Sequence, residues 1–216
     1  MISVLTDNWE LFRDGFLTTI KLFLIAGTLS LALGTLLAAC RVSSIPTLRT
    51  VSTAYVNGVR STPLTLIFAF LIFAGPKIGL DFSSFFWSAI AALTLYTASF
   101  VCEVIRAGMN TIPLGQAEAA RAIGLSHTQV LRIVIIPQSF KVIVPPMGSV
   151  AIALLKNTTI AAGFSVAEAG AIPAAMAERG ENQMATLVWI ALGFLLLVTP
   201  LALGQRWAER KLAVPA

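Results

Sequence analysis

The sequence has few charged residues. Only 12% of its 216 residues are Asp, Glu, Lys or Arg, whereas 57% are apolar, and the mean hydropathy is +0.86. A soluble domain carries about 25% charged residues, so this scarcity argues against a soluble protein with a large core. Several apolar stretches reach the roughly 20 residues that a helix needs to cross a bilayer. The composition therefore predicts an all-α integral membrane protein.

The sequence has almost no histidine, and it lacks the phosphate-binding loop motif. His127 is the one histidine, and no Gly-Lys pair occurs anywhere. A metal centre or a Ser-His-Asp site normally needs histidine, and a phosphate loop needs Gly-Lys before Ser or Thr. We therefore expect no enzyme activity, metal or cofactor in this chain. The two cysteines, Cys40 and Cys102, fall in or beside apolar segments and are expected to be free thiols.

The apolar segments predict one membrane domain, 1–216, with five transmembrane helices. A further stretch, 164–183, is too short and too mixed to cross the bilayer. It predicts a short helix on the outer face, either a cap over a translocation path or a simple connector. The expected spans are 16–39, 52–74, 85–105, 141–163 and 184–205.

The net charge of +5 is interpreted as a topology signal and not as nucleic-acid binding. One set of loops collects most of the basic residues, and the opposite set carries most of the acidic ones. This bias predicts a multi-pass protein of the cytoplasmic membrane, with the N-terminus outside, the C-terminus inside and residues 106–140 in the cytoplasm. The inner set contains Arg41, Arg49, Arg106, Arg121, Arg132, Lys141, Arg206, Arg210 and Lys211.

The polar segment 113–136 predicts a compact helical hairpin. Pro113 can open a first helix, and Gly124 can end it in the left-handed conformation. Ser126 precedes Gln129 by three residues, which is the spacing of a capping box at the start of a second helix. We expect Pro137 to end that helix. Its apolar stripe consists of Val130, Leu131, Val134 and Ile135.

This hairpin resembles the EAA loop of ABC transporter permeases, on the surface that receives the ATP-hydrolysing subunit. The resemblance lies in Gln before Glu-Ala-Ala, a following Ile-Gly, and a closing Ile-Pro. The same segment without a partner would be a packed cytoplasmic loop. The resemblance implies that the residues coupling to the ATPase are Gly115, Gln116, Glu118, Ala119, Ala120, Gly124 and Pro137.

Three further elements extend the resemblance over nearly the whole chain. Residues 55–63 are similar to a Tyr…Arg-Gly-Thr-Pro element, with Ser61 in place of Gly. Residues 103–108 are similar to Glu-x-x-Arg-Gly-Gly, with Ala107 departing, and residues 156–159 to Lys-Asp-Thr-Ser, with Asn157 departing. These departures weaken any transfer of substrate identity.

The chain is thus identified as a member of the polar amino-acid uptake permeases of the histidine, glutamine and glutamate type. The resemblance implies the type I ABC importer permease fold and a role as the subunit that forms the translocation path. It also implies three partners: an ATPase subunit that binds ATP and Mg, an extracytoplasmic amino-acid-binding protein, and a second permease that is identical or paralogous. Among substrates, glutamate or a related amino acid is preferred.

Charged and polar residues inside the expected spans need partners, water or a function, because a charge at a helix centre costs roughly 2.5–3.5 kcal/mol. Arg60, Thr62 and Pro63 are assigned to the substrate path, or else Arg60 anchors a helix end in lipid phosphates. Lys156, Asn157, Thr158 and Thr159 are assigned to the same path, or else form an interhelical hydrogen-bond cluster. Glu103 and Arg106 are expected to form a structural ion pair.

An ion-coupled secondary amino-acid transporter is the alternative function. Such transporters commonly show internal repeats and intramembrane acids that carry the coupling ion. This chain shows no repeat, and Glu103 is its one candidate acid, with an arginine nearby. The sequence therefore favours the ATP-driven importer.

Overall fold

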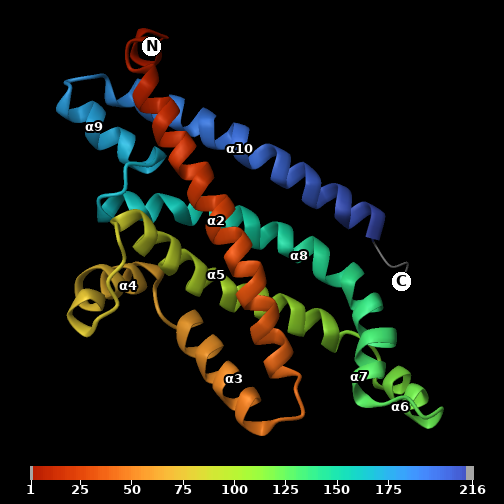
Figure 1. Cartoon of the computed structure of the whole chain (residues 1–216). Coiled ribbons are helices and arrows are strands. Elements are labelled where there is room, and N and C mark those ends of the chain that lie inside the picture. Colours follow the sequence, from red (N-terminus) through yellow and green to blue (C-terminus); the bar gives the residue numbers. More distant parts are fainter. Residues whose placement is uncertain (1, 213–216) are drawn as a thin grey trace.

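The computed structural model describes residues 2–212, and within them it contains helices and no β-strand (Figure 1). This confirms the predicted all-α membrane bundle. The helices are α1 (Ile2–Asp7), α2 (Trp9–Arg41), α3 (Pro46–Arg60), α4 (Leu64–Ala69), α5 (Phe85–Asn110), α6 (Leu114–Ala122), α7 (His127–Gln129), α8 (Ile136–Asn157), α9 (Ile172–Glu178) and α10 (Gln183–Leu212). Two π-helices, η1 (Phe70–Ala74) and η3 (Val130–Ile135), and three 3₁₀ helices, η2 (Gly75–Ile78), η4 (Thr158–Phe164) and η5 (Ala169–Ala171), complete the chain.

Four helical segments among the described residues are long and apolar enough to cross a membrane: α2, α5, α10 and the continuous segment His127–Phe164. A bent pair, Pro46–Arg60 with Leu64–Ile78, adds a fifth span if it counts as one. The count of five therefore stays a prediction. The stretch between η4 and α10 forms only short helices, η5 and α9, as expected for residues 164–183.

The second expected span, 52–74, is not one continuous helix. The chain turns by 105° between α3 and α4. Pro63 lies in the break with φ −58° and ψ 136°. Proline lacks a backbone N–H and disfavours helical geometry in the residue before it, so the helix stops at Arg60 and a new one begins after the proline.

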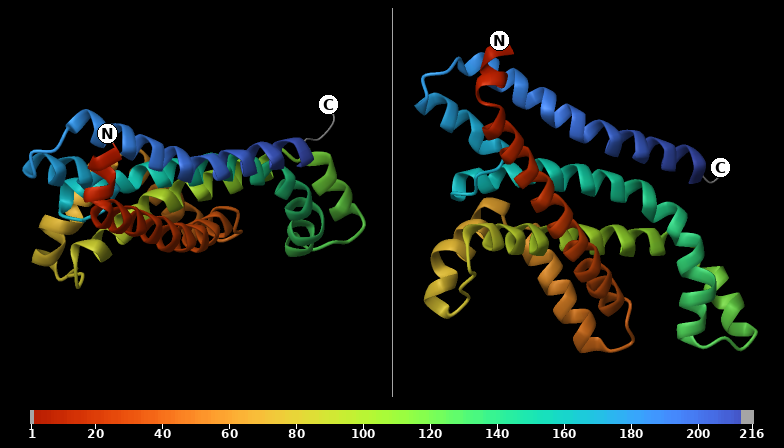
Figure 2. Two further views of the ribbon diagram at one scale, coloured as in Figure 1. Left: turned by 90° about the horizontal axis from the view of Figure 1, so that it is seen from above. Right: turned by 45° about the horizontal axis from the view of Figure 1, so that its top comes forward.

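The helices α5, α8 and α10 follow one another in that order across the molecule (Figure 2). α2 crosses in front of α5 and α8 in Figure 1. Leu22, Phe68, Leu93 and Leu154 lie in the main buried cluster, so α2, α4, α5 and α8 share one apolar core.

Small residues allow the helices to approach closely. A Cβ added to Gly34 of α2 would lie 2.5 Å from Val101 of α5, and one added to Gly108 of α5 would lie 2.4 Å from Ile143 of α8. Helices in membranes associate mainly through such van der Waals packing, because lipid tails are as apolar as their side chains. α5 is therefore fixed on both sides by glycine contacts.

Candidate functional site

The polar segment after α5 forms a short helix, a glycine turn and the start of a second helix at one end of the bundle (Figure 1). α6 ends at a glycine turn: Gly124 has φ +90°, its N–H donates to Arg121 O at 2.9 Å, and Leu125 N–H donates to Ala120 O at 3.1 Å. Both bonds satisfy carbonyls that the end of the helix leaves free. The left-handed conformation expected at Gly124 is confirmed.

The second helix of the hairpin begins with the expected capping box. Gln129 N–H donates to Ser126 Oγ at 3.4 Å, and Ser126 N–H donates to Gln129 Oε1 at 2.8 Å. These reciprocal bonds satisfy donors that have no partner within the helix. The hairpin is therefore closed by its own local chemistry.

Pro137 does not end this second helix, and that expectation is wrong. α7 continues through η3 into α8, so one helical segment runs from His127 to Phe164. Pro137 falls in the first turn of α8, directly after the π-helix. Prolines and π turns are the usual positions of bends within a helix, and the segment bends at this point without ending (Figures 1 and 2).

The residues assigned to ATPase coupling lie along α6 and its turn. Gly115, Gln116, Glu118, Ala119 and Gly124 are exposed, whereas Ala120 is buried. The side-chain amide of Gln138 in α8 donates to Gln116 Oε1 and also to Val134 O at 3.0 Å. α6 is thus tied by a side-chain bond to the base of α8.

Two large apolar side chains stand out of α6 at its ends. Leu114 is 80% exposed and Ile123 is 79% exposed. Between them the side chains are mostly those of Gly and Ala, which project little from the helix backbone. They form what we call the low surface of α6. A polar hairpin that presents apolar side chains around a low surface has the features of a contact surface for another protein.

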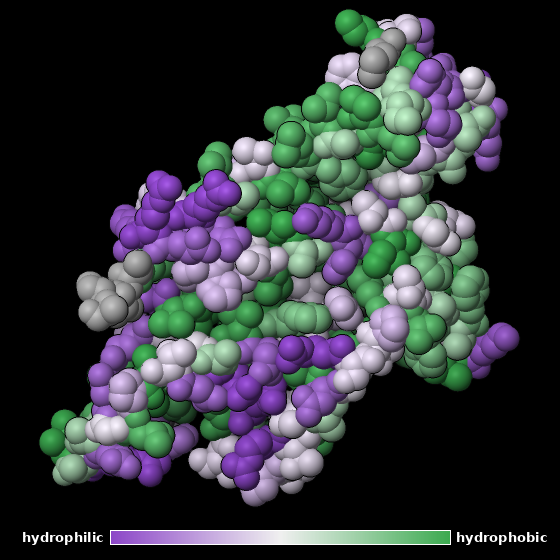
Figure 3. All heavy atoms as spheres, turned by 180° about the vertical axis from the view of Figure 1, so that it is seen from behind, coloured by the Kyte–Doolittle hydropathy of each residue, from purple (hydrophilic) through white to green (hydrophobic). Residues whose placement is uncertain are grey.

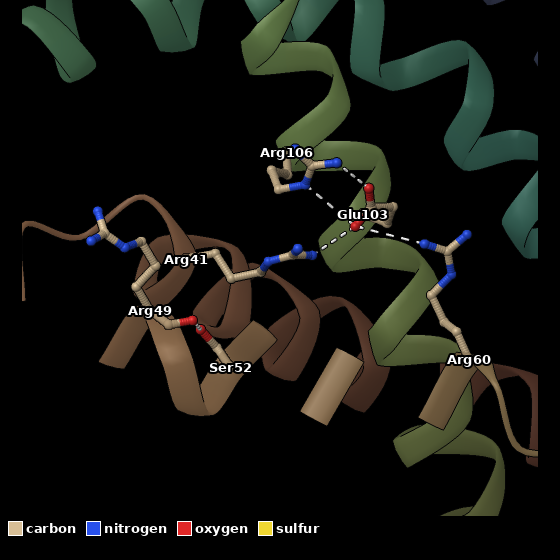
Figure 4. Close-up of polar contacts among 6 residues, drawn as sticks. All are labelled: Arg41, Arg49, Ser52, Arg60, Glu103 and Arg106. Atoms are coloured by element: carbon tan, nitrogen blue, oxygen red, sulfur yellow. Dashed lines mark hydrogen bonds and ion pairs between the residues drawn. The ribbon is translucent and has the colours of Figure 1, made fainter. Parts of the chain in front are cut away.

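Glu103 on α5 takes part in three of the four salt bridges found among residues 2–212 (Figure 4). Arg41 of α2 donates to its carboxylate at 2.6 Å, Arg106 of α5 donates to both of its oxygens, and Arg60 of α3 lies 3.7 Å from Oε2. We call these four residues the arginine cluster. It joins three helices through one acid, and it holds the pair Glu103–Arg106 that the sequence suggested.

Arg60 therefore takes part in an ion pair, beside the break between α3 and α4. Its guanidinium also lies over the ring of Phe100, 5.3 Å from the centroid. Thr62 Oγ1 donates to Gly58 O at 2.9 Å and so caps the end of α3. Arg60, Thr62 and Pro63 lie together at this break, and Arg60 contacts α5 through Phe100 and Glu103.

The polar turn 156–159 is distributed over several faces of the helix. Thr158 Oγ1 and Thr159 Oγ1 donate to the carbonyls of Leu155 and Lys156, at 2.8 and 2.7 Å. Thr158 is fully buried, whereas Lys156 is exposed. The two hydroxyls thus bind helix carbonyls, and Lys156 and Asn157 keep polar groups available for other partners.

Asn157 borders a hollow of about 410 Å³ between α5 and α8. Tyr96 and Phe100 of α5 and Ser149 of α8 also line it. Phe100 connects the hollow to Arg60, while Lys156 lies seven residues after Ser149 on one face of α8. Figure 3 shows hydrophilic side chains interrupting the hydrophobic surface on the face seen from behind.

Comparison with known proteins identifies the chain. The model of the binding-protein-dependent transport system inner membrane component family matches residues 30–214. The chain belongs to this family. Glutamate transport system permease protein GluC of Corynebacterium efficiens is 41% identical over 99% of both chains. Probable glutamine ABC transporter permease protein GlnM of Bacillus subtilis is 34% identical, over 98% of this chain and 97% of its own.

Solved structures agree with this assignment. An amino acid ABC transporter crystallised with histidines superimposes with a TM-score of 0.89 at 27% identity, over 96% of each chain. The inward-facing MetNI methionine ABC transporter gives 0.77 at 22% identity, over 95% of this chain and 98% of that one, which shows the shared fold. The protein is therefore a multi-pass inner-membrane permease subunit of an ABC importer, and the ion-coupled alternative finds no support.

The permease also contains a buried acid that sequence patterns did not single out. Glu168 is 1% exposed; Thr19 Oγ1 of α2 donates to its Oε2 at 3.0 Å, and Gly170 N–H donates to its Oε1 at 2.7 Å. Burial raises the pKa of this carboxyl above its ordinary value, while the hydrogen bonds from Gly170, Thr19 and Ala169 oppose the rise. Glu168 thereby fastens the segment before α9 to α2.

Tyr96, Phe100 and Arg41 were also missed as site residues. The two aromatic residues lie in an apolar stretch, where an aromatic side chain is normally a core residue. Arg41 was assigned to a topology signal. Spacing along one helix could place only Arg106 beside Glu103, because both lie in α5. Arg41 and Arg60 belong to α2 and α3, and the sequence does not show how those helices pack against α5.

Proposed function

We propose that this permease carries polar amino acids, and that glutamate or a related amino acid is its substrate. The names of its relatives support this class, since GluC is a glutamate and GlnM a probable glutamine permease protein. The hollow between α5 and α8 supports it chemically. It combines aromatic walls with the amide of Asn157 and the hydroxyl of Ser149, and its 410 Å³ volume suits a small polar solute.

The substrate path includes Arg60, Thr62, Pro63, Lys156, Asn157, Thr158 and Thr159. Lys156 supports this assignment most directly: it is exposed on an apolar span, and within residues 2–212 it has no ion-pair partner. A lysine in that position is costly toward lipid and tolerable toward water or protein. We infer that this face of α8 meets a water-filled path bordered by a second permease subunit.

The proposed coupling role depends on the structure of the hairpin. An ATPase subunit, which binds ATP and Mg, contacts α6 through Leu114, Ile123 and the low surface between them. Because α6 is bonded to α8 through Gln116 and Gln138, movement of the ATPase reaches the span directly. The hairpin then lies in the cytoplasm with the C-terminus, and the N-terminus lies outside, where a binding protein delivers the amino acid.

Co-purification tests the coupling surface. We expect Ile123→Ser and Glu118→Arg to reduce recovery of the ATPase subunit with the tagged permease, since they alter the exposed face of α6. Ile133→Ser is the matched control, because Ile133 is also a large exposed isoleucine but lies outside α6. Full recovery of the ATPase and full transport with both α6 variants would contradict the coupling role.

Competition in proteoliposomes tests the substrate. We expect unlabelled glutamate to compete with labelled glutamate uptake by the reconstituted complex, and arginine and histidine to compete poorly. Better competition by arginine or histidine would contradict the substrate and leave the importer class intact. Lys156→Gln is expected to lower uptake without changing ATPase recovery, which separates the path from the coupling surface.

A further inference from the structure

A deep groove separates the C-terminal half of α2 from the beginning of α8. Its volume is about 830 Å³, and α7, η3 and the end of α5 complete its walls. The walls are mostly apolar. The residues that define the course of the groove are Leu31 and Thr35 of α2, Val42 directly after α2, Met109 of α5, and Phe140 and Met147 of α8. We call it the α2–α8 groove. In Figure 1 its boundaries are the lower part of α2 and the start of α8.

The groove has the length of one membrane leaflet. It extends from Leu31 in α2 to Val42 directly after that helix, which is about 16 Å at 1.5 Å per residue. Half of the hydrocarbon core of a bilayer is about 15 Å. A second hollow of about 370 Å³ continues it toward the membrane centre and shares Leu31 and Met147 with it.

The two ends of the groove differ in chemistry. The deep end is apolar, whereas the end beside the hairpin is bordered by Arg132, Ser43, Ser44 and Thr128. Arg132 is exposed and forms no salt bridge within residues 2–212, in contrast to Arg41, whose charge is paired with Glu103. An unpaired guanidinium beside hydroxyls offers several hydrogen-bond donors to a phosphate group.

The groove opens toward lipid. Thr97 and Leu154 line both the apolar continuation of the groove and the hollow assigned to the amino acid. These two spaces therefore lie on opposite sides of the contact between α5 and α8. Among the residues that line the groove, Leu31, Ile136 and Phe140 are 52%, 48% and 60% exposed, which is the kind of surface that helices present to acyl chains.

We propose that the α2–α8 groove binds one anionic phospholipid, with an acyl chain along α2 and the phosphate on Arg132. A chain entering the groove exchanges one apolar environment for another, so the headgroup charge determines selectivity. A basic pocket between transmembrane helices at the cytoplasmic surface has the chemistry that binds acidic headgroups. The inference requires the hairpin to lie at the membrane surface, but it does not depend on the proposed substrate or on the coupling role of α6.

Native mass spectrometry of the purified permease–ATPase complex tests the proposal. The complex is titrated in detergent with dioleoylphosphatidylglycerol or dioleoylphosphatidylcholine, and bound lipids are counted. We expect the anionic lipid to bind at least about fivefold more tightly, which is roughly the effect of one basic residue at a membrane surface. Arg132→Gln should remove this preference. Arg49→Gln is the control, since Arg49 is an exposed arginine of α3 outside the groove.

Ala39→Phe provides a second test, because Ala39 lines the groove and a phenyl ring there would occupy the path of the chain. This variant should weaken the binding of both lipids. Equal binding of the two lipids, or unchanged preference in Arg132→Gln, would overturn the proposal. Displacement of the lipid by millimolar inorganic phosphate would also overturn it, because it would indicate an anion site without a chain.

Discussion

The arginine cluster permits a quantitative test by double-mutant cycles. Glu103 forms ion pairs with three arginines whose side chains differ in exposure. Arg41 is 10% exposed, Arg106 is 33% exposed and Arg60 is 41% exposed. Removing one partner of a buried ion pair costs about 3–5 kcal/mol, whereas an exposed pair contributes about 0–1 kcal/mol. The coupling energy to Glu103 should therefore decrease in the order of increasing exposure.

For Arg41 we expect a coupling energy of about 2–3 kcal/mol, below the fully buried value because Glu103 itself is 22% exposed. For Arg60, whose atoms lie 3.7 Å from the carboxylate, we expect less than about 1 kcal/mol. Each cycle combines Glu103→Gln with an Arg→Gln change. The free energy of unfolding is measured in mixed detergent and SDS micelles by fluorescence of the four tryptophans.

Arg49→Gln is the control for these cycles, since the Arg49 side chain points away from Glu103 (Figure 4) and should show no coupling. Equal coupling of Arg41 and Arg60 would refute the reasoning from exposure. Coupling of Arg41 below 0.5 kcal/mol, on the scale of surface pairs, would show that this carboxylate does not hold the three helices together.

Three further predictions concern packing, capping and pH. Gly108→Ala should destabilise the fold by about 1–3 kcal/mol because its Cβ meets Ile143, and Ile143→Ala should relieve this in thermal unfolding. Ser126→Ala should cost about 0.5–2 kcal/mol of local stability and speed amide exchange at Gln129, whereas Ser126→Thr should not. The raised pKa of Glu168 means that the folded state holds its proton more tightly, so its contribution is complete below pH 4.5 and is lost as pH rises through the folded pKa. Glu168→Gln should abolish this component of the stability–pH curve.

Local features of the fold could be predicted from the sequence because neighbouring residues determine them. Gly124 adopts the left-handed conformation, and Ser126 with Gln129 closes a capping box. In each case the chemistry involves residues within four positions of one another. The long apolar segments were predictable for a similar reason, since composition alone decides whether a helix can cross a bilayer.

Long-range contacts could not be predicted in this way. Arg41 and Glu103 are 62 positions apart, and Thr19 and Glu168 are 149 apart. A single sequence reports spacing along one helix and gives no measure of how helices cross. Arg60 was therefore assigned to the substrate path or to a lipid anchor, and its contact with the carboxylate of Glu103 was not foreseen.

Pro137 shows a different limit, in which a sound local rule gives the wrong boundary. Proline normally interrupts an α-helix because it lacks an N–H and its ring meets the preceding turn. Here a π-helix directly precedes the turn that contains Pro137. Inserted π turns are rare in helices, so the pattern gave no reason to expect one.

The absence of a loop between the hairpin and the fourth span has a mechanical consequence. From His127 to Asn157 the chain stays helical, but it bends where η3 joins α8, at the π turn and Pro137 (Figures 1 and 2). Prolines and π turns are the usual positions at which a helix bends. A displacement of α6 therefore reaches α8, and the hollow between α5 and α8, through a bent helix and not through a loop.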